Sequence, residues 1–384
     1  MQNIISAHCP PEEPRPYRWL RITRVQVIEE GLTCAATTGL VAMFTRTLSV
    51  ARKFTIPRPC PSAATTAPLQ ALSRCSRSSS TQSSFYYLRP LPEYNNTKPY
   101  YINLPPWAIP DGRNTNEESA AYDLTVSDLR GREAGFTLDK NGFQIVRETQ
   151  AGNDTVVCSF PWELRWDTEA VRRAVAPAVE RFLRNFLGAE TAITFSFRTR
   201  RRDAQFPVLP RGSDPNIPQP VQGVHVDFTP EHSRIIAKAL SARNNIPNLH
   251  NRRWGIISVW RPLFGPLQDW PLGVLDYTSL DVANDLIASD NIYPYEIKEN
   301  YNVFYNPKHH WCYLSDHEPN ELLLFKAFDT ERSPGVARVC PHAAFSHPDT
   351  PSDARPRESV ECLSLVIYPE GSAKQYENEE DLPS

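Results

Sequence analysis

The stretch "GVHVDFTP", residues 223–230, places a histidine, His225, two positions before a carboxylate, Asp227. Side chains two positions apart on an extended segment point to the same face, so both groups can bind one metal ion. Two histidines and one carboxylate on one face of an octahedron form the facial triad of non-heme Fe(II) oxygenases. A His-X-Asp pair also occurs by chance on ordinary strands. The metal interpretation therefore requires a second histidine elsewhere in the chain.

The second histidine is expected far along the chain, on another strand. His342 is the favoured candidate because it directly follows the strand-like stretch "VARVC", 336–340, whose end can hold it rigidly. His347 lies in the proline-rich stretch "SHPDTP", 346–351, which is typical of a solvated turn. His310, in another strand-like stretch, is the alternative ligand.

An oxygenase of this kind also needs a cation for its cosubstrate. 2-Oxoglutarate chelates iron through its keto acid end, and arginine is the best bidentate partner for its far carboxylate. Arg357 follows His342 and stands just before the strand-like "VECLSLVIY", 360–368. Ser359 has the same orientation two residues later and can add a hydroxyl donor. Arg355 is the less suitable arginine.

The distribution of apolar residues and prolines predicts a mainly β fold with flanking helices. The chain has 384 residues, of which 36 are proline, and short strand-like runs dominate from Trp254 onward. Many short strands with proline-rich turns are typical of a sandwich, a jelly roll or a barrel. Two helices are expected to pack outside it. One lies within 166–190, capped by Asp167 or Thr168 and ended by Gly188, and one lies within 229–243 with Thr229 as its N-cap.

Charge, hydropathy and cysteine content exclude several classes of protein. The net charge of −3 gives no support for nucleic-acid binding. No run of about 18 apolar residues predicts a membrane span. None of the eight cysteines forms a CxxC pair, which argues against a zinc ribbon. A reducing, intracellular compartment fits best; the cytoplasm is favoured, and mitochondria are the alternative if Met43 is the start.

The first 84 residues differ in composition from the rest. Between Gly31 and Pro92 there is no acidic residue but there are seven basic ones, and the stretch that follows Met43 is amphipathic. This composition is typical of a transit peptide; the alternative is a disordered tail or a start placed too far upstream. We expect 1–84 to lie outside the fold, 85–369 to form an oxygenase-like domain, and 370–384 to form an acidic disordered tail.

Several stretches resemble the fungal AsaB-type hydroxylase/desaturase family, which includes the gibberellin desaturase. They are "VHVD" (224–227), "SVWRPLFGPLQDWPLGVLDYTSL" (258–280), "PKHHWCYLSDHEPNELLLFKAFD" (307–329), "CPHAAF" (340–345) and "RPRESVECLSLVIYP" (355–369). The resemblance covers about 85–369. It implies a double-stranded β-helix, the jelly-roll and cupin-like fold, and the use of Fe(II), 2-oxoglutarate and dioxygen. The motif matches place the iron ligands at His225, Asp227 and His342, and the cosubstrate cation at Arg357.

The same resemblance implies the reaction. Members of the family commonly hydroxylate or desaturate small secondary metabolites. The family is also similar to the small subunit of the cephem 7-alpha-methoxylase, which assists a partner. The alternative function is therefore a partner-dependent subunit with the same fold and a possible partner enzyme.

Five further residues are candidates for contact with the substrate. Arg261, beside Trp260, is expected either to contact substrate or cosubstrate or to form a structural pair with Asp276. The other three lie on one strand whose alternate side chains can face the interior; they are His310, Trp311 and Tyr313. Their alternative role is packing in the core.

Two charged stretches call for an explanation. Lys326 lies in the apolar run "LLLFKAFD", 322–329, where a buried charge is costly without a partner. It is expected to pair with an acid such as Asp329 or to point at the pocket. The run "RTRRRD", 198–203, is interpreted as a solvated loop; the alternative is a basic patch that attracts an acidic substrate.

Overall fold

The structure is a computed structural model that describes residues 80–374 and 382, except 105, 110–111, 149–155, 157–159 and 208–216. The chain divides into two units, Met1–Ala71 and Leu72–Ser384, and all described residues belong to the second. The predicted boundary at residue 84 falls inside the first strand, β1 (Ser80–Leu88). The predictions for the segment before Ser80 and for most of the acidic tail lie outside the described residues.

Two β-sheets form the framework of this unit. The nine-stranded sheet has the order β1 (Ser80–Leu88), β3 (Ser119–Asp128), β11 (Trp311–Tyr313), β8 (Leu272–Leu275), β13 (His342–Ala344), β6 (His225–Val226), β10 (Ile297–Val303), β9 (Leu286–Ile292), β2 (Tyr100–Ile102). The five-stranded sheet has the order β4 (Phe143–Arg147), β12 (Glu321–Asp329), β7 (Trp254–Pro262), β14 (Glu358–Ile367), β5 (Thr191–Arg201). The predicted jelly-roll class is confirmed.

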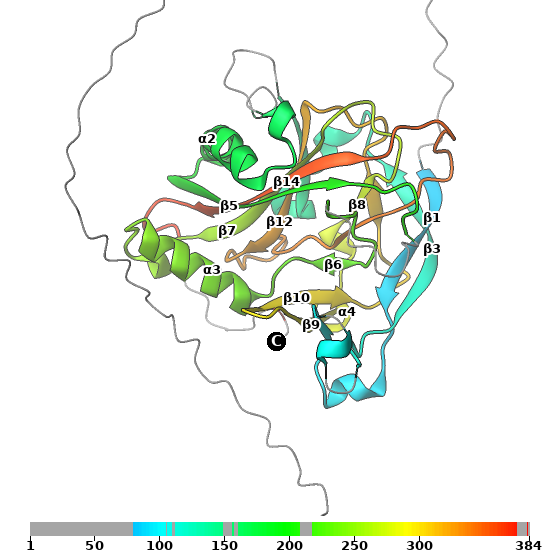
Figure 1. The fold of residues 1–384 in the computed structure, drawn as a ribbon. Coiled ribbons are helices and arrows are strands. Elements are labelled where there is room, and N and C mark those ends of the chain that lie inside the picture. The colour runs from blue at the N-terminus through cyan, green and yellow to red at the C-terminus, as the bar shows by residue number, and fades with distance from the viewer. Residues whose placement is uncertain are drawn as a thin grey trace, which may run out of the picture. The chain divides into compact units, whose positions relative to one another are not determined.

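The main core lies between the inner faces of the two sheets. Val226 and Tyr301 of the larger sheet belong to the same buried cluster as Ile256 and Leu365 of the smaller one. Figure 1 shows β5, β14, β7 and β12 as one layer, with β6, β10 and β9 below it. The strands β7 and β12 are buried along their whole length. Both faces of these two strands are covered, and this explains why they are almost continuously apolar.

Helix α2 (Thr168–Leu187) covers the outer face of the five-stranded sheet. Its N-cap is Asp167, whose carboxylate accepts the backbone N–H of Ala170 at 3.0 Å, and it ends at Gly188 in the left-handed conformation. Val171 and Leu183 on its apolar face join a second buried cluster with the outer side chains of the sheet. Both predicted ends of this helix are confirmed.

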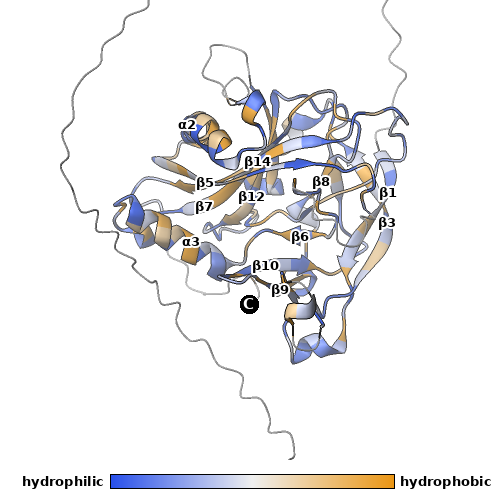
Figure 2. Ribbon diagram, in the orientation of Figure 1, coloured by the Kyte–Doolittle hydropathy of each residue, from blue (hydrophilic) through white to orange (hydrophobic). Residues whose placement is uncertain are grey.

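Helix α3 (Pro230–Arg243) begins immediately after the His-X-Asp motif, and Thr229 caps it as predicted, by accepting the backbone N–H of His232. Figure 2 shows apolar residues gathered on strands such as β7 and β12, whereas α2 and α3 carry both apolar and polar residues. Within the described ranges, no helix is long and apolar enough to cross a membrane. The shorter helices are α1 (Leu138–Asn141) and α4 (Val282–Asp285), with single 3-10 turns at Pro92–Asn95, Pro106–Ala108, Glu133–Gly135, Trp162–Leu164, Leu249–Asn251 and Tyr277–Ser279.

A buried ion pair locks β12 to the loops beside it. The ammonium of Lys326 lies 2.7 Å from the carboxylate of Asp329 and 2.9 Å from that of Asp139, and it donates to the carbonyl of Ala337 at 2.8 Å. The predicted pairing with Asp329 is confirmed. Asp329 also pairs with Arg253 at 2.6 Å.

Replacing Lys326 with methionine is expected to lower the free energy of unfolding by about 3 kcal/mol, the lower end of the cost of breaking a buried pair, because Asp329 keeps Arg253 as a partner. Urea denaturation of the full chain measures the change. The exposed Lys238 of α3, replaced by methionine, serves as the control and should stay within about 0.5 kcal/mol of wild type. Equal stability of the two variants would contradict a stabilising role for the pair.

Candidate metal centre

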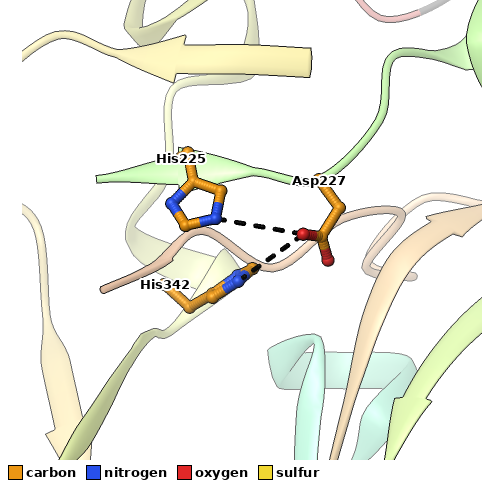
Figure 3. A group of neighbouring side chains, drawn as sticks. All are labelled: His225, Asp227 and His342. Carbon is orange, nitrogen blue, oxygen red and sulfur yellow. Dashed lines mark ion pairs between the residues drawn. The ribbon is translucent and has the colours of Figure 1, made fainter. Parts of the chain in front are cut away.

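The sheet register brings together two histidines that lie far apart in the sequence. Strands β6 and β13 pair antiparallel, and His342 stands directly opposite His225. Asp227 follows β6, just before Thr229 caps helix α3. Figure 3 shows both imidazoles pointing towards one carboxylate oxygen of Asp227. One ligand atom from each of these three residues lies within 4.8 Å of the others.

Both imidazoles present the same nitrogen to the centre. The Nε2 atoms of His225 and His342 each lie 3.9 Å from Oδ1 of Asp227. The Nδ1 atom of His225 is 2.8 Å from the carbonyl of Gly223, and that of His342 is 3.1 Å from the carbonyl of Cys340. A carbonyl accepts only, so each Nδ1 must carry the proton and each Nε2 offers its lone pair.

These residues fit a divalent transition metal. Two bonds of about 2.1 Å to one ion place their donor atoms at most about 4.2 Å apart, so a single ion spans the 3.9 Å separations. Burial, and then the proximity of His342, lowers the pKa of His225 to about 4, which keeps this ring neutral. Oδ2 of Asp227 is buried and has no hydrogen-bond partner among the described residues. A half-buried carboxylate beside a neutral imidazole calls for a cation.

A second part of the predicted site lies at the start of β14. Arg357 is 2% exposed, and its guanidinium donates to the carbonyl of Trp270 at 2.8 Å and to the hydroxyl of Ser359 at 3.3 Å. Trp270 has a φ of 46°, an uncommon value for a residue with a side chain, and this conformation aims its carbonyl at the arginine. The ring of Trp260 lies 5.3 Å from the guanidinium.

The charge of Arg357 has no carboxylate partner within 4.0 Å in the part of the chain that the structure describes. The nearby Asp269 accepts the backbone N–H of Arg357 instead, and its carboxylate pairs with Arg202 at 2.6 Å. Burial, and then the charge of Arg200, lowers the pKa of Arg357 to about 9. A buried cation of this kind is stabilised by an anionic ligand.

A pocket of about 760 Å³ opens in front of His225 and Asp227. Its volume lies within the range of about 300–1,000 Å³ that is usual for small-molecule sites. Apolar walls come from residues such as Phe195, Phe228 and Leu363, and Arg200 and Glu361 add charge from the five-stranded sheet. The opposite wall comes from β9, β10 and the turn between them, which includes Tyr293.

The structure places the candidate substrate residues away from this pocket's lining. The ring of Trp260 packs against the guanidinium of Arg357. Arg261 points to the opposite face of β7, where its guanidinium lies 5.0 Å from the ring of Phe160. Asp276, its proposed structural partner, accepts the amide of Asn141 at 3.0 Å.

The three candidate residues on and beside β11 also lie outside the lining of this pocket. His310 is exposed, and its Nε2 lies 3.0 Å from the hydroxyl of Ser127. Trp311 is fully buried and donates its indole N–H to Tyr87 at 2.7 Å. The hydroxyl of Tyr313 lies 2.9 Å from Nε2 of His347. A role of these residues in substrate contact stays a prediction that this pocket does not support.

The run "RTRRRD", 198–203, belongs partly to a strand that lines the pocket. Its interpretation as a solvated loop is wrong for its first half, because β5 extends to Arg201 and pairs with β14 throughout. Ser196, Arg198 and Arg200 share the strand face that lines the pocket. The alternation of "FSFRTR", 195–200, is the signal that predicts this face.

Two sheets in a jelly roll, with a His-X-Asp…His triad between them, define the class of non-heme iron oxygenases. Residues 85–367 match the family YDMC, described as an oxidoreductase/YMDC permease-like domain. The hydroxylase/desaturase efuI of Hormonema carpetanum is 30% identical over 72% of this chain and 96% of its own length. The GA4 desaturase of the Gibberella fujikuroi gibberellin cluster is 25% identical over 67% of this chain and 90% of its own length.

Solved structures agree with these matches. The iron and alpha-ketoglutarate-dependent endoperoxidase NvfI superposes with a TM-score of 0.64 at 25% identity, over 76% of this chain and 98% of its own. The chain therefore belongs to the matched oxidoreductase family and, within it, to the fungal AsaB-type hydroxylase/desaturases. It is an Fe(II)- and 2-oxoglutarate-dependent oxygenase that acts on a small molecule.

Proposed function

We propose that His225, Asp227 and His342 hold Fe(II), and that Arg357 with Ser359 binds the far carboxylate of 2-oxoglutarate. The protein then hydroxylates or desaturates an organic metabolite that enters the pocket in front of His225. The observation that carries this assignment is the convergence of two Nε2 atoms on one oxygen of Asp227, both at 3.9 Å. The buried guanidinium of Arg357, which has no carboxylate beside it in the described ranges, supports the cosubstrate assignment.

The chain's own residues prepare the centre for this chemistry. Iron with 2-oxoglutarate and dioxygen supplies an oxidant that removes hydrogen from an unactivated C–H bond, with release of succinate and carbon dioxide. The carbonyls of Gly223 and Cys340 fix the two imidazole tautomers through their Nδ1 protons. Phe325 packs its ring 4.6 Å from that of His342 and excludes water from this side.

The chain supplies the three triad residues and the cation itself, so we expect it to consume 2-oxoglutarate without a partner enzyme. The structure describes three cysteines, Cys312, Cys340 and Cys362, and all three are buried free thiols. This state supports a reducing intracellular compartment. The cytoplasm is the simplest choice, and mitochondria are the alternative.

An anaerobic titration tests the proposal. Fe(II) followed by 2-oxoglutarate is expected to produce the weak visible charge-transfer absorption of a keto acid chelated at a facial-triad iron. The band should be lost in a His342→Ala protein, and it should need far more 2-oxoglutarate in an Arg357→Gln protein. His310→Ala, the alternative ligand that lies on the exposed surface, is the matched control and should behave as wild type. A folded, iron-loaded wild type that shows no band would contradict the assignment.

A further inference from the structure

Arg200 lies in the pocket of His225 and Asp227 but has no part in the assignments above. It stands on β5 directly opposite Ser359 of β14. Side chains alternate along β5, so Phe197 enters the cluster beneath α2 whereas Arg200 lines the pocket. The pocket therefore contains a cation besides the metal site.

The surroundings of Arg200 orient its charge without neutralising it. Its guanidinium donates to the carbonyl of Gln219 at 2.7 Å. Among the residues the structure describes, no carboxylate comes within 4.0 Å of it. Burial lowers the pKa of Arg200, and the charge of Glu361 opposes this effect from a distance. Glu361 itself accepts the hydroxyl of Ser258 at 2.8 Å.

The acidic side chains that line the pocket have partners of their own, and the other lining arginine, Arg198, is exposed to solvent. Glu117 accepts the amide of Asn302 at 2.6 Å, and Glu296 pairs with Lys298 at 3.0 Å. Asp227 belongs to the metal triad. Arg200 is thus a partly buried pocket cation for which the described part of the chain provides no close counterion.

The cosubstrate does not supply an anion for both arginines. Of the two carboxylates of 2-oxoglutarate, one belongs to the end that chelates the metal, which leaves one for a cation. Arg357 is the better holder of that carboxylate, because it is 2% exposed and shares a hydrogen bond with Ser359. The charges of Arg200 and Arg357 oppose each other. A second anion beside Arg200 would relieve that opposition.

We propose that Arg200 binds a carboxylate of the organic substrate, so that the enzyme acts on hydrophobic organic acids. The proposal rests on the function proposed above and deepens it. Phe195, Phe228 and Leu363 provide the apolar surface for the rest of such a molecule. Arginine matches a carboxylate with two parallel hydrogen bonds, which fixes the orientation of the acid as well as its affinity.

The test compares acids with uncharged molecules of the same shape. Full-length protein holding Fe(II) and 2-oxoglutarate without oxygen is titrated with naphthalene-1-acetate, fluorene-9-carboxylate and dansylglycine, each beside its primary amide. In wild type at least one acid should bind about ten- to a hundredfold more tightly than its amide. In Arg200→Gln this preference should vanish, and Arg200→Lys should restore part of it. Arg198→Gln, an exposed neighbour on the same strand face, is the control and should keep the preference.

The 2-oxoglutarate titration of the same samples separates the possible results. Unchanged cosubstrate binding in Arg200→Gln, with the acid preference lost, supports the proposal and also shows that the variant folds. A wild type without acid preference overturns the proposal. This result includes the case in which every acid binds as tightly as its amide and the case in which no acid and no amide binds. An Arg200→Gln protein that loses affinity for 2-oxoglutarate but keeps its acid preference also overturns the proposal, because both arginines would then serve the cosubstrate. An acid preference without the charge-transfer band would count against the proposed iron chemistry alone and would leave Arg200 as an acid site.

Discussion

An Asp227→Ala protein is expected to consume 2-oxoglutarate far more slowly than wild type. Removal of a residue that only supports a metal ligand costs roughly 10- to 100-fold in affinity or activity, and the loss of a ligand should cost well over that. Asp227 is the only carboxylate of the triad, and its Oδ1 lies 3.9 Å from both Nε2 atoms. Without it the metal would face only two imidazoles, one of which burial keeps neutral. The measurement is succinate formation at saturating iron, with wild type alongside.

The same variant should leave the metal-free protein intact. Oδ2 of Asp227 is buried and lacks a hydrogen-bond partner among the described residues, so its removal costs the fold little and can even stabilise it. Manganese should raise the melting temperature of wild type but not of Asp227→Ala, because an ion stabilises the folded state only when it binds, and the variant should not bind it. Glu296→Gln is the matched control, since this carboxylate lines the same pocket but pairs with Lys298. Full activity in Asp227→Ala would refute the metal assignment.

An Arg357→Gln protein is expected to bind 2-oxoglutarate about thirtyfold or more weakly. Loss of one partner of a buried, hydrogen-bonded charge pair costs about 2–5 kcal/mol. The guanidinium is 2% exposed and has no carboxylate of the described chain within 4.0 Å, so the cosubstrate would be its counterion. Isothermal titration of the manganese-loaded protein with 2-oxoglutarate, without oxygen, measures the dissociation constant.

The control for this prediction is Arg355→Gln. Arg355 stands two residues earlier, is mostly exposed, and pairs with Glu358 at 3.0 Å. Its replacement should change 2-oxoglutarate affinity less than about threefold, because exposed ion pairs contribute little. If both variants bound 2-oxoglutarate equally well, the cation for the cosubstrate would have to be sought elsewhere, and Arg200 would be the first candidate.

Local patterns in the sequence were sufficient for several features of the fold. The caps Asp167, Gly188 and Thr229 are short-range signals, because each acts on backbone groups within one turn. The pairing of Lys326 with Asp329 followed from the cost of a lone charge in an apolar strand. The mainly β class followed from short strand-like runs between prolines. Such signals need no knowledge of distant neighbours.

The sequence by itself determined the chemistry that the chain can carry: a His-X-Asp pair, a distant histidine at the end of a strand-like stretch, and Arg357 with Ser359 before the last strand. Only the tertiary structure decided which side chains meet at the metal centre and which line the pocket. The pairing of β6 with β13 selected His342 over His310, because it sets His342 opposite His225. The same packing sent Trp311 into the core and turned Arg200 towards the pocket. Strand pairing joins residues across long stretches of chain, and no local pattern encodes which face of one strand will meet another.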